Sequence, residues 1–279
     1  MSEDKTEANS ADDSPCLDLT IAVPLLKGNG WRGLLRRSLE KVLGIKAIRQ
    51  LFADASKKAF PNPFARSLQL TNIAVDAEGV IDAIPANGGA IIIANHPFGG
   101  ADAVAFSSLC IKKRADSKIL ANSMMKNAPG IGEYLMPLKI LNEENAARHN
   151  LKTLKEASKH VSNGGVLGVF PAGAISKYIS SEGEITDPEW SEHIARIALR
   201  TKVPVVPVFF YGKNSLIFQI LGSLNGLLRA ALIPRGYLAL ENKSIKCRAG
   251  KMISHEELAK AEDPTNYLRN AVYKIEHSA

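Results

Sequence analysis

A histidine and an aspartate six positions apart are the side chains of this chain best placed to do chemistry. His96 follows the apolar run Ile91–Ile93, and Asp102 follows the paired glycines Gly99 and Gly100. A β-branched run that stops in a Gly-rich turn predicts a strand, a tight turn and a helix start, and the glycines allow the turn to bring both side chains together. A carboxylate bonded to one imidazole nitrogen leaves the other free to take a proton from a hydroxyl. The pair therefore indicates general-base chemistry.

Each of the two residues also has an ordinary structural interpretation. Asp102 stands where a helix-capping residue is favoured, and His96 could be a loop histidine bonded to the backbone. The occurrence of Asn95-His96-Pro97 together with two glycines and an aspartate favours chemistry over two unrelated structural roles.

Other kinds of reactive site find no support in the sequence. There is no Gly-x-Ser-x-Gly elbow, no Walker or dinucleotide glycine pattern, and no pair of histidines at metal-ligand spacing. The cysteines Cys16, Cys110 and Cys247 are widely separated, which indicates a reducing compartment. We therefore expect no metal and no cofactor, and direct transfer to an acceptor hydroxyl that His96 activates.

Alternating strands and helices must position the pair. The expected strands are one or two within 68–85, then 91–93, 118–121, 166–170, 203–210, 237–240 and 245–248. The expected helices are 101–112, 144–161, 187–201 (with Asp187 as its cap), 215–231 and 254–276. This order favours an α/β fold with a mostly parallel central sheet flanked by helices. Sites in such sheets form beyond the carboxyl ends of the strands.

Composition divides the chain into three regions. We expect residues 1–20 to be a disordered acidic tail, 21–60 an N-terminal amphipathic helical segment, and 61–279 the catalytic α/β domain. The helical segment joins Trp31 to several basic residues, as in membrane-surface helices, although an ordinary packed surface helix has the same pattern. The weakly charged 216–232 segment is a second candidate membrane contact or a buried core helix.

Charge and hydropathy restrict the partners. The formal net charge of +7 suits anionic partners. Aromatic residues make up only 6% and no basic–aromatic stripe occurs, so nucleic acid is not an expected partner. No signal-peptide pattern and no apolar run long enough to span a bilayer is found.

Three sequence blocks resemble the glycerolipid acyltransferase family, typified by the 1-acylglycerol-3-phosphate acyltransferases. That family is marked by Asn-His-x4-Asp, then Phe-Pro-Glu-Gly, then a Val-Pro-rich strand. Here the blocks are Asn95–Asp102, Phe170–Gly173 and Val203–Val208, and the resemblance covers roughly residues 68–253. It implies that His96 and Asp102 are catalytic and that the acyl donor is a thioester on coenzyme A or acyl carrier protein.

Two departures from the family pattern bear on the acceptor. Five residues rather than four separate His96 from Asp102, which is similar to the bacterial haemolysin-like branch. Ala172 stands where the family usually has Glu, and Ala174-Ile175 where Thr-Arg is common. Because that block is implicated in holding the acceptor's phosphate, a lyso-aminolipid, such as a lyso-ornithine-type lipid, is expected beside a lysophospholipid.

The resemblance implies a set of substrate-contacting residues around the catalytic pair. These are Asn95, Phe98, Gly99, Gly100, Arg148, Phe170, Pro171, Gly173 and Asn214. Arg148 could equally be a solvated helix charge. Backbone N–H groups near Gly99–Gly100 or in the 170–173 turn are expected to stabilise the oxyanion.

The expected function is an O-acyltransferase of membrane lipid biosynthesis, peripheral at the cytoplasmic face of the inner membrane. Two alternatives stay open: a lipid ester or thioester hydrolase using the same His/Asp pair, and a non-catalytic membrane lipid-binding protein.

Overall fold

A seven-stranded sheet with the order β1-β9-β8-β2-β5-β3-β4 lies at the centre of the protein. The computed structural model describes residues 19–57, 62–139, 145–215, 218–219 and 226–278. The strands are β1 (Ala74–Asp76), β2 (Ala90–Ala94), β3 (Lys118–Asn122), β4 (Leu135–Leu138), β5 (Val166–Val169), β8 (Val205–Tyr211) and β9 (Ser244–Ala249). Among the described strands of this sheet, only β8 and β9 pair antiparallel, which confirms the predicted mostly parallel sheet.

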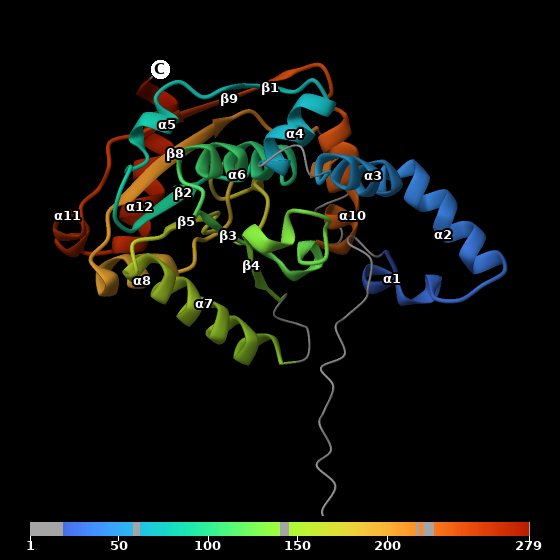
Figure 1. Ribbon diagram of the computed structural model, residues 1–279, viewed down its shortest axis with the longest axis horizontal. Coiled ribbons are helices and arrows are strands. Elements are labelled where there is room, and N and C mark those ends of the chain that lie inside the picture. Colours follow the sequence, from blue (N-terminus) through green and yellow to red (C-terminus); the bar gives the residue numbers. More distant parts are fainter. Residues whose placement is uncertain (1–18, 58–61, 140–144, 216–217, 220–225, 279) are drawn as a thin grey trace, which may run out of the picture.

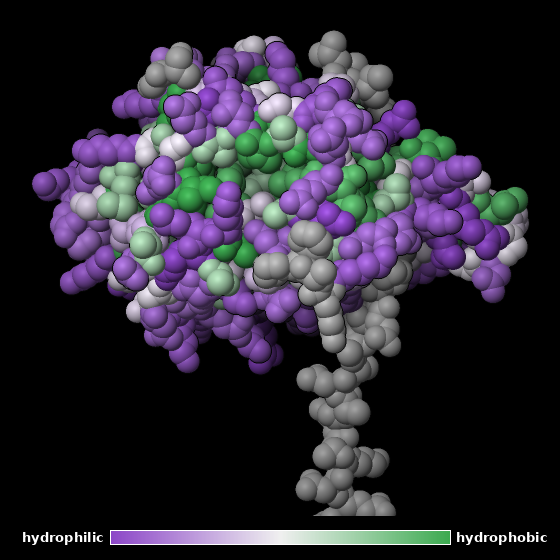
Figure 2. Space-filling model, turned by 45° about the horizontal axis from the view of Figure 1, so that its top comes forward, coloured by the Kyte–Doolittle hydropathy of each residue, from purple (hydrophilic) through white to green (hydrophobic). Residues whose placement is uncertain are grey.

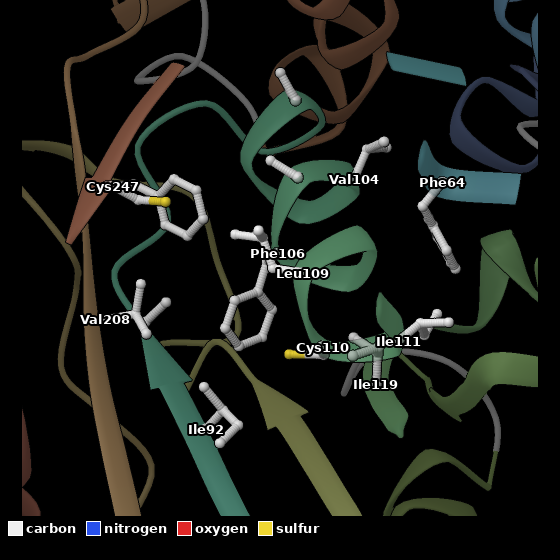
Figure 3. Close-up of a cluster of buried hydrophobic side chains, with 14 of the residues drawn as sticks. Phe64, Ile92, Val104, Phe106, Leu109, Cys110, Ile111, Ile119, Val208 and Cys247 are labelled. Carbon is white, nitrogen blue, oxygen red and sulfur yellow. The ribbon is translucent and has the colours of Figure 1, made fainter. Parts of the chain in front are cut away.

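Helices cover both faces of the sheet (Figure 1). One face carries α3 (Ile45–Ala55), α4 (Pro63–Leu70) and α6 (Ala101–Lys113), and the other carries α7 (Ala146–Ser162), α8 (His193–Thr201), α11 (His255–Ala259) and α12 (Pro264–Tyr273). Strand β2 is buried at every position because it faces both layers: Ile92 enters the first core and Ile91 and Ile93 the second. Figure 3 shows α6 packing Phe106 and Leu109 against Ile92 and Val208 of the sheet.

The N-terminal helices lie against the same body. Short α1 (Leu19–Ala22), a 3-10 turn (Pro24–Leu26), α2 (Trp31–Val42) and α3 follow one another, and α10 (Gly226–Leu238) packs beside them. Ile48 and Phe52 of α3 enter the main core, whereas α2 extends away from it at the right of Figure 1. In the described part of the chain, no helix is both long enough and apolar enough to cross a membrane.

Several predicted elements differ from those observed. Within 68–85 the chain forms the end of α4, the three-residue β1 and α5 (Val80–Ala83), because Asn62 caps α4 and Pro63 begins it. The predicted strand 237–240 is wrong, since Tyr237 and Leu238 end α10. The predicted final helix divides into α11, capped by Ser254, and α12, capped by Asp263.

Two predicted segments lie partly or wholly outside the described residues, and one predicted helix begins later than expected. Residues 1–18, 216–217 and 220–225 lie outside the described residues, and so do the acidic tail and much of the 215–231 segment. The helix predicted from Asp187 begins instead at His193. The stretch before Asp187 forms an antiparallel hairpin, β6 (Lys177–Ile179) and β7 (Glu184–Thr186), which the sequence analysis missed.

Candidate active site

Three neighbouring parallel strands end at one rim of the sheet. In the register of β2, Ile93 lies opposite Val169 of β5 and Pro207 of β8. The residues that follow, the turn after Asn95 and the Phe170–Gly173 turn, therefore meet at this rim. These turns therefore lie beyond the carboxyl ends of the strands, where sites in parallel sheets form.

His96 and Asp102 contact each other across this turn. Nδ1 of His96 lies 3.1 Å from Oδ2 of Asp102, whose side chain is 0% exposed. The carboxylate also accepts the backbone N–H groups of Phe98 at 2.8 Å and Ala103 at 2.8 Å. These bonds fix the carboxylate, and since Nδ1 is the nitrogen that it holds, Nε2 is the nitrogen left for a substrate proton.

The environment of His96 favours its protonated form. Burial by itself would lower the pKa of His96, but the carboxylates of Asp102 and Asp187 outweigh burial and raise this pKa above its ordinary 6.5. The imidazole also stacks on the ring of Phe170, with the centroids 4.0 Å apart. A base whose protonated form is stabilised in a fixed orientation is suited to accept a hydroxyl proton.

Gly99 allows the turn after His96 to pack closely. Its φ is +82°, a left-handed conformation, and a Cβ at this position would collide with the side chain of Ile175. Gly100 lies close to α10: a Cβ added to this glycine would be 3.0 Å from Cγ2 of Ile233. The two glycines therefore allow Ile175 and α10 to pack against the turn that carries His96.

The side chains of two asparagines that were predicted to contact substrate form hydrogen bonds with backbone groups in this structure. The buried amide of Asn95 donates to the carbonyl of Phe210 at 2.9 Å and accepts the N–H of Phe210 at 2.7 Å, which joins the ends of β2 and β8. Nδ2 of Asn214 donates to the carbonyls of Pro97 at 2.9 Å and Phe98 at 3.2 Å. Both side chains thus position the turn that carries His96.

The remaining predicted residues divide between the rim and the sheet edge. Phe98 packs under Gly212 at the end of β8, and Gly173 closes a turn by donating its N–H to the carbonyl of Phe170 at 3.0 Å. The carbonyl of Pro171 accepts the N–H of Ser191 at 3.0 Å. Arg148 lies exposed near the start of α7, which packs beside edge strand β4, and β4 is three strands from β2 in the sheet order.

The sequence analysis missed a carboxylate at this site. Asp187, which it read as a helix cap, is 0% exposed and accepts the backbone N–H of His96 at 3.1 Å. An Asp-Pro pair before a helical pattern gives a strong capping signal. Nothing in the neighbouring sequence distinguishes an aspartate that caps a helix from one that makes a tertiary contact. Within the described ranges, no group of three or more His, Cys, Asp or Glu side chains could hold a metal ion.

Comparisons with known proteins agree with this geometry. A family model described as Acyltransferase matches residues 78–211, the stretch that contains His96, Asp102 and Asp187. Two curated relatives named Lyso-glycine lipid O-acyltransferase are each 26% identical to the chain. The one from Phocaeicola vulgatus aligns over 80% of this chain and 80% of its own length, and the one from Bacteroides thetaiotaomicron over 85% and 88%.

A solved structure shares the fold. The crystal structure of the 1-acyl-sn-glycerophosphate (LPA) acyltransferase PlsC from Thermotoga maritima matches with a TM-score of 0.51 at 19% identity. The match covers 86% of this chain and 81% of that one.

Proposed function

We propose that this chain moves a fatty acyl group from an acyl thioester to the hydroxyl of a lysolipid in membrane lipid biosynthesis, which its similarity to an Acyltransferase family model and to two lysolipid O-acyltransferases supports. The observation that carries this proposal is the contact of His96 with the fully buried carboxylate of Asp102 at the rim of a parallel sheet. That geometry supplies a general base and its orienting partner.

The proposed reaction needs only the two substrates and side chains of this chain. Nε2 of His96 takes the proton of the lysolipid hydroxyl while the oxygen attacks the thioester carbonyl carbon. Asp102 holds the imidazole and stabilises its positive form. The C–S bond then breaks and the proton passes to the departing thiolate, so the products are the acylated lipid and a free thiol. The donor is coenzyme A or acyl carrier protein.

For the acceptor we propose a lyso-aminolipid, a lysolipid with an amino-acid headgroup. Both curated relatives are named for a lyso-glycine lipid. In addition, Ile175, where the family commonly has Arg, is 6% exposed and packs against Gly99, and Ala172 offers no carboxylate. An apolar side chain there gives a phosphomonoester no cation to bind, which supports a headgroup other than a phosphate.

The direct test is transfer of labelled acyl groups by the purified protein. Acyl-CoA and acyl carrier protein thioesters are each offered with a lyso-glycine lipid, a lyso-ornithine lipid or lysophosphatidic acid. We expect the diacylated aminolipid to form and the His96→Ala variant to lose about 10²–10⁴ in rate. Fatty acid released without an acceptor would establish the hydrolase instead, and lipid binding with no turnover by any donor would establish a binding protein. Lipid analysis of a strain lacking the gene identifies the acceptor as the lysolipid that accumulates.

We further propose that helix α2 attaches the protein peripherally to the cytoplasmic face of the inner membrane. Exposed apolar side chains lie there and around the preceding 3-10 turn, and green patches stand among hydrophilic surface at the right of Figure 2. These side chains are Val23, Leu25, Trp31, Leu34, Leu35 and Val42. Arg32, whose guanidinium carbon lies 5.4 Å from the Trp31 ring, stands among further basic residues of the same helix. Apolar and basic side chains on one helix are typical of attachment to an anionic lipid surface.

Vesicle flotation tests the attachment. The intact protein should float with vesicles containing anionic phospholipid, and the double variant Trp31→Ser/Leu34→Ser should stay in solution. The matched control is Leu151→Ser, an equally exposed leucine on α7. If the double variant floats as well as the unmodified protein, α2 is not the attachment site.

A further inference from the structure

Asp187 supplies a second buried carboxylate at the catalytic histidine, and it contacts the main chain of that residue. Its Oδ1 accepts the backbone N–H of His96 at 3.1 Å and the hydroxyl of Ser176 at 2.6 Å. Its Oδ2 accepts the indole N–H of Trp190 at 3.1 Å. With a side chain that is 0% exposed, this carboxylate is surrounded by hydrogen-bond donors.

The bonds of Asp187 and Ser176 form the neck of the β6–β7 hairpin. Ser176 precedes β6 and Asp187 follows β7, so their side-chain hydrogen bond joins the two ends of the hairpin. The N–H of Ser176 also donates to the carbonyl of His96 at 2.9 Å. Both backbone polar groups of His96 are therefore bonded to this neck, while its imidazole is held from α6 by Asp102.

The charge of Asp187 has no basic side chain bonded to it among the described residues. Burial raises the pKa of Asp187, and the donors from Ser176, His96 and Trp190 oppose that rise. The charged groups that face His96 are Asp102 from α6 and Asp187 from the end of β7, while Phe170 is neutral. From α12, the hydroxyl of Tyr273 accepts the backbone N–H of Asp187 at 2.9 Å. Arg269 of the same helix bonds to Glu182 and Thr186.

We propose that Asp187 is a positioning residue for acyl transfer. Its carboxylate fixes the main chain of His96, and its negative charge stabilises the imidazolium that forms when the lysolipid hydroxyl gives up its proton. The proton passes from the hydroxyl oxygen to Nε2 of His96 and later to the thiolate sulfur, and Asp187 takes no proton in this sequence. The inference rests on the proposed function, since it assigns His96 the role of general base.

The test removes the charge while keeping the size of the side chain. Asp187→Asn retains an oxygen that can accept the His96 N–H but carries no charge. Trp190→Phe and Ser176→Ala are the matched controls, because each removes one donor and leaves the carboxylate. Two readouts are taken: the pKa of His96 from NMR of isotope-labelled histidine, and the pH profile of kcat/KM.

In Asp187→Asn we expect the pKa of His96, and with it the acidic limb of the profile, to fall by roughly 1 pH unit. Loss of the charge that stabilises the imidazolium should lower kcat by roughly 10- to 100-fold and leave KM for donor and acceptor within about twofold. The two controls should keep the pKa of His96 within a few tenths of a unit. The inference is overturned if folded Asp187→Asn titrates like the unmodified protein, or if the controls move the pKa as much.

A further measurement covers the case in which Asp187→Asn does not fold. In the unmodified protein the amide proton of His96 should be protected from exchange and shifted downfield by its carboxylate acceptor, and an unprotected, unshifted amide overturns the inference. The NMR titration needs no substrate, so it also separates the two proposals. A protein that transfers no acyl group but shows the expected pKa shift refutes the function while the contact with His96 stands.

Discussion

The imidazole of His96 lies almost flat on the ring of Phe170, with the ring planes 23° apart and the centroids separated by 4.0 Å. Phe170 is the first residue after β5, and Phe106 of α6 supports its ring from the core at 5.0 Å. The stack sets the plane of the imidazole, and the contact with Asp102 sets its rotation within that plane. Together they decide where Nε2 points.

Replacing Phe170 by leucine should therefore impair catalysis more than folding. The variant keeps an apolar side chain but loses the flat surface under His96, so we expect kcat to fall about tenfold or more and stability by only about 1–2 kcal/mol. Steady-state kinetics and urea unfolding measure the two effects. Phe64→Leu, in the same core but away from His96, is the control and should lose stability with kcat little changed. Equal loss of kcat in both variants would show that the stack has no special role.

Asn95→Ala should lower stability through two unpaired backbone groups. Removing the amide leaves the N–H and the carbonyl of Phe210 buried without their partner, and we expect a loss of about 2–3 kcal/mol in the free energy of unfolding. Asn122→Ala, which removes an exposed cap, should cost less than about 1 kcal/mol. An unchanged stability in Asn95→Ala together with a raised acceptor KM would instead assign Asn95 to substrate binding.

Gly99→Ala should damage the site through both backbone strain and contact. A residue with φ of +82° is strained unless it is glycine, and the added methyl would strike Ile175. Gly164 has a similar φ of +94° with nothing within 4 Å of a built Cβ, so Gly164→Ala measures the strain alone. We expect Gly99→Ala to lose about 1–3 kcal/mol more stability than Gly164→Ala, and acyl transfer to fall only in the former. Similar results for the two variants would show that contact with Ile175 is unimportant.

Arg114 should matter for stability and not for catalysis. Its guanidinium donates to the carbonyls of Pro85, Gly88 and Gly164, at the amino ends of β2 and β5 and so opposite the rim that carries His96. Arg114→Met should lower the free energy of unfolding by about 2–3 kcal/mol and leave kcat within about twofold. Arg196→Met, which removes an exposed pair with Glu192, should cost less than about 1 kcal/mol. A large fall in kcat for folded Arg114→Met would contradict this assignment.

The titration of His96 predicts how stability depends on pH. A group whose folded-state pKa is raised contributes stability that is fully present below its unfolded pKa of 6.5 and disappears as the pH rises through the folded-state value. The unmodified protein should therefore lose more stability than His96→Gln on going from about pH 6 to about pH 9. Urea unfolding at both pH values measures this difference. A histidine variant whose stability falls just as much over this range would show that the pKa of His96 is not raised.

The sequence determined the central strands and the placement of His96 beside Asp102 because their signals are local. The run Ile91–Ile93 is apolar on both sides, which requires a strand covered on both faces, and Gly99-Gly100 requires the tight turn that brings Asp102 back to His96. The Asn95–Asp102 and Phe170–Gly173 blocks lie after neighbouring parallel strands, so their meeting at one rim followed from the fold class.

Only the tertiary structure decided what surrounds the imidazole. Asp187 lies 91 positions from His96 and Phe210 lies 115 from Asn95, and hydrophobic periodicity and capping preferences carry no information about partners so distant. For the same reason Asp187 looked like a helix cap, although its carboxylate is bonded to His96, Ser176 and Trp190. The sequence thus predicts which groups are suited to activate a hydroxyl, and the packing of residues 170–176 and of the hairpin neck decides how the imidazole is held.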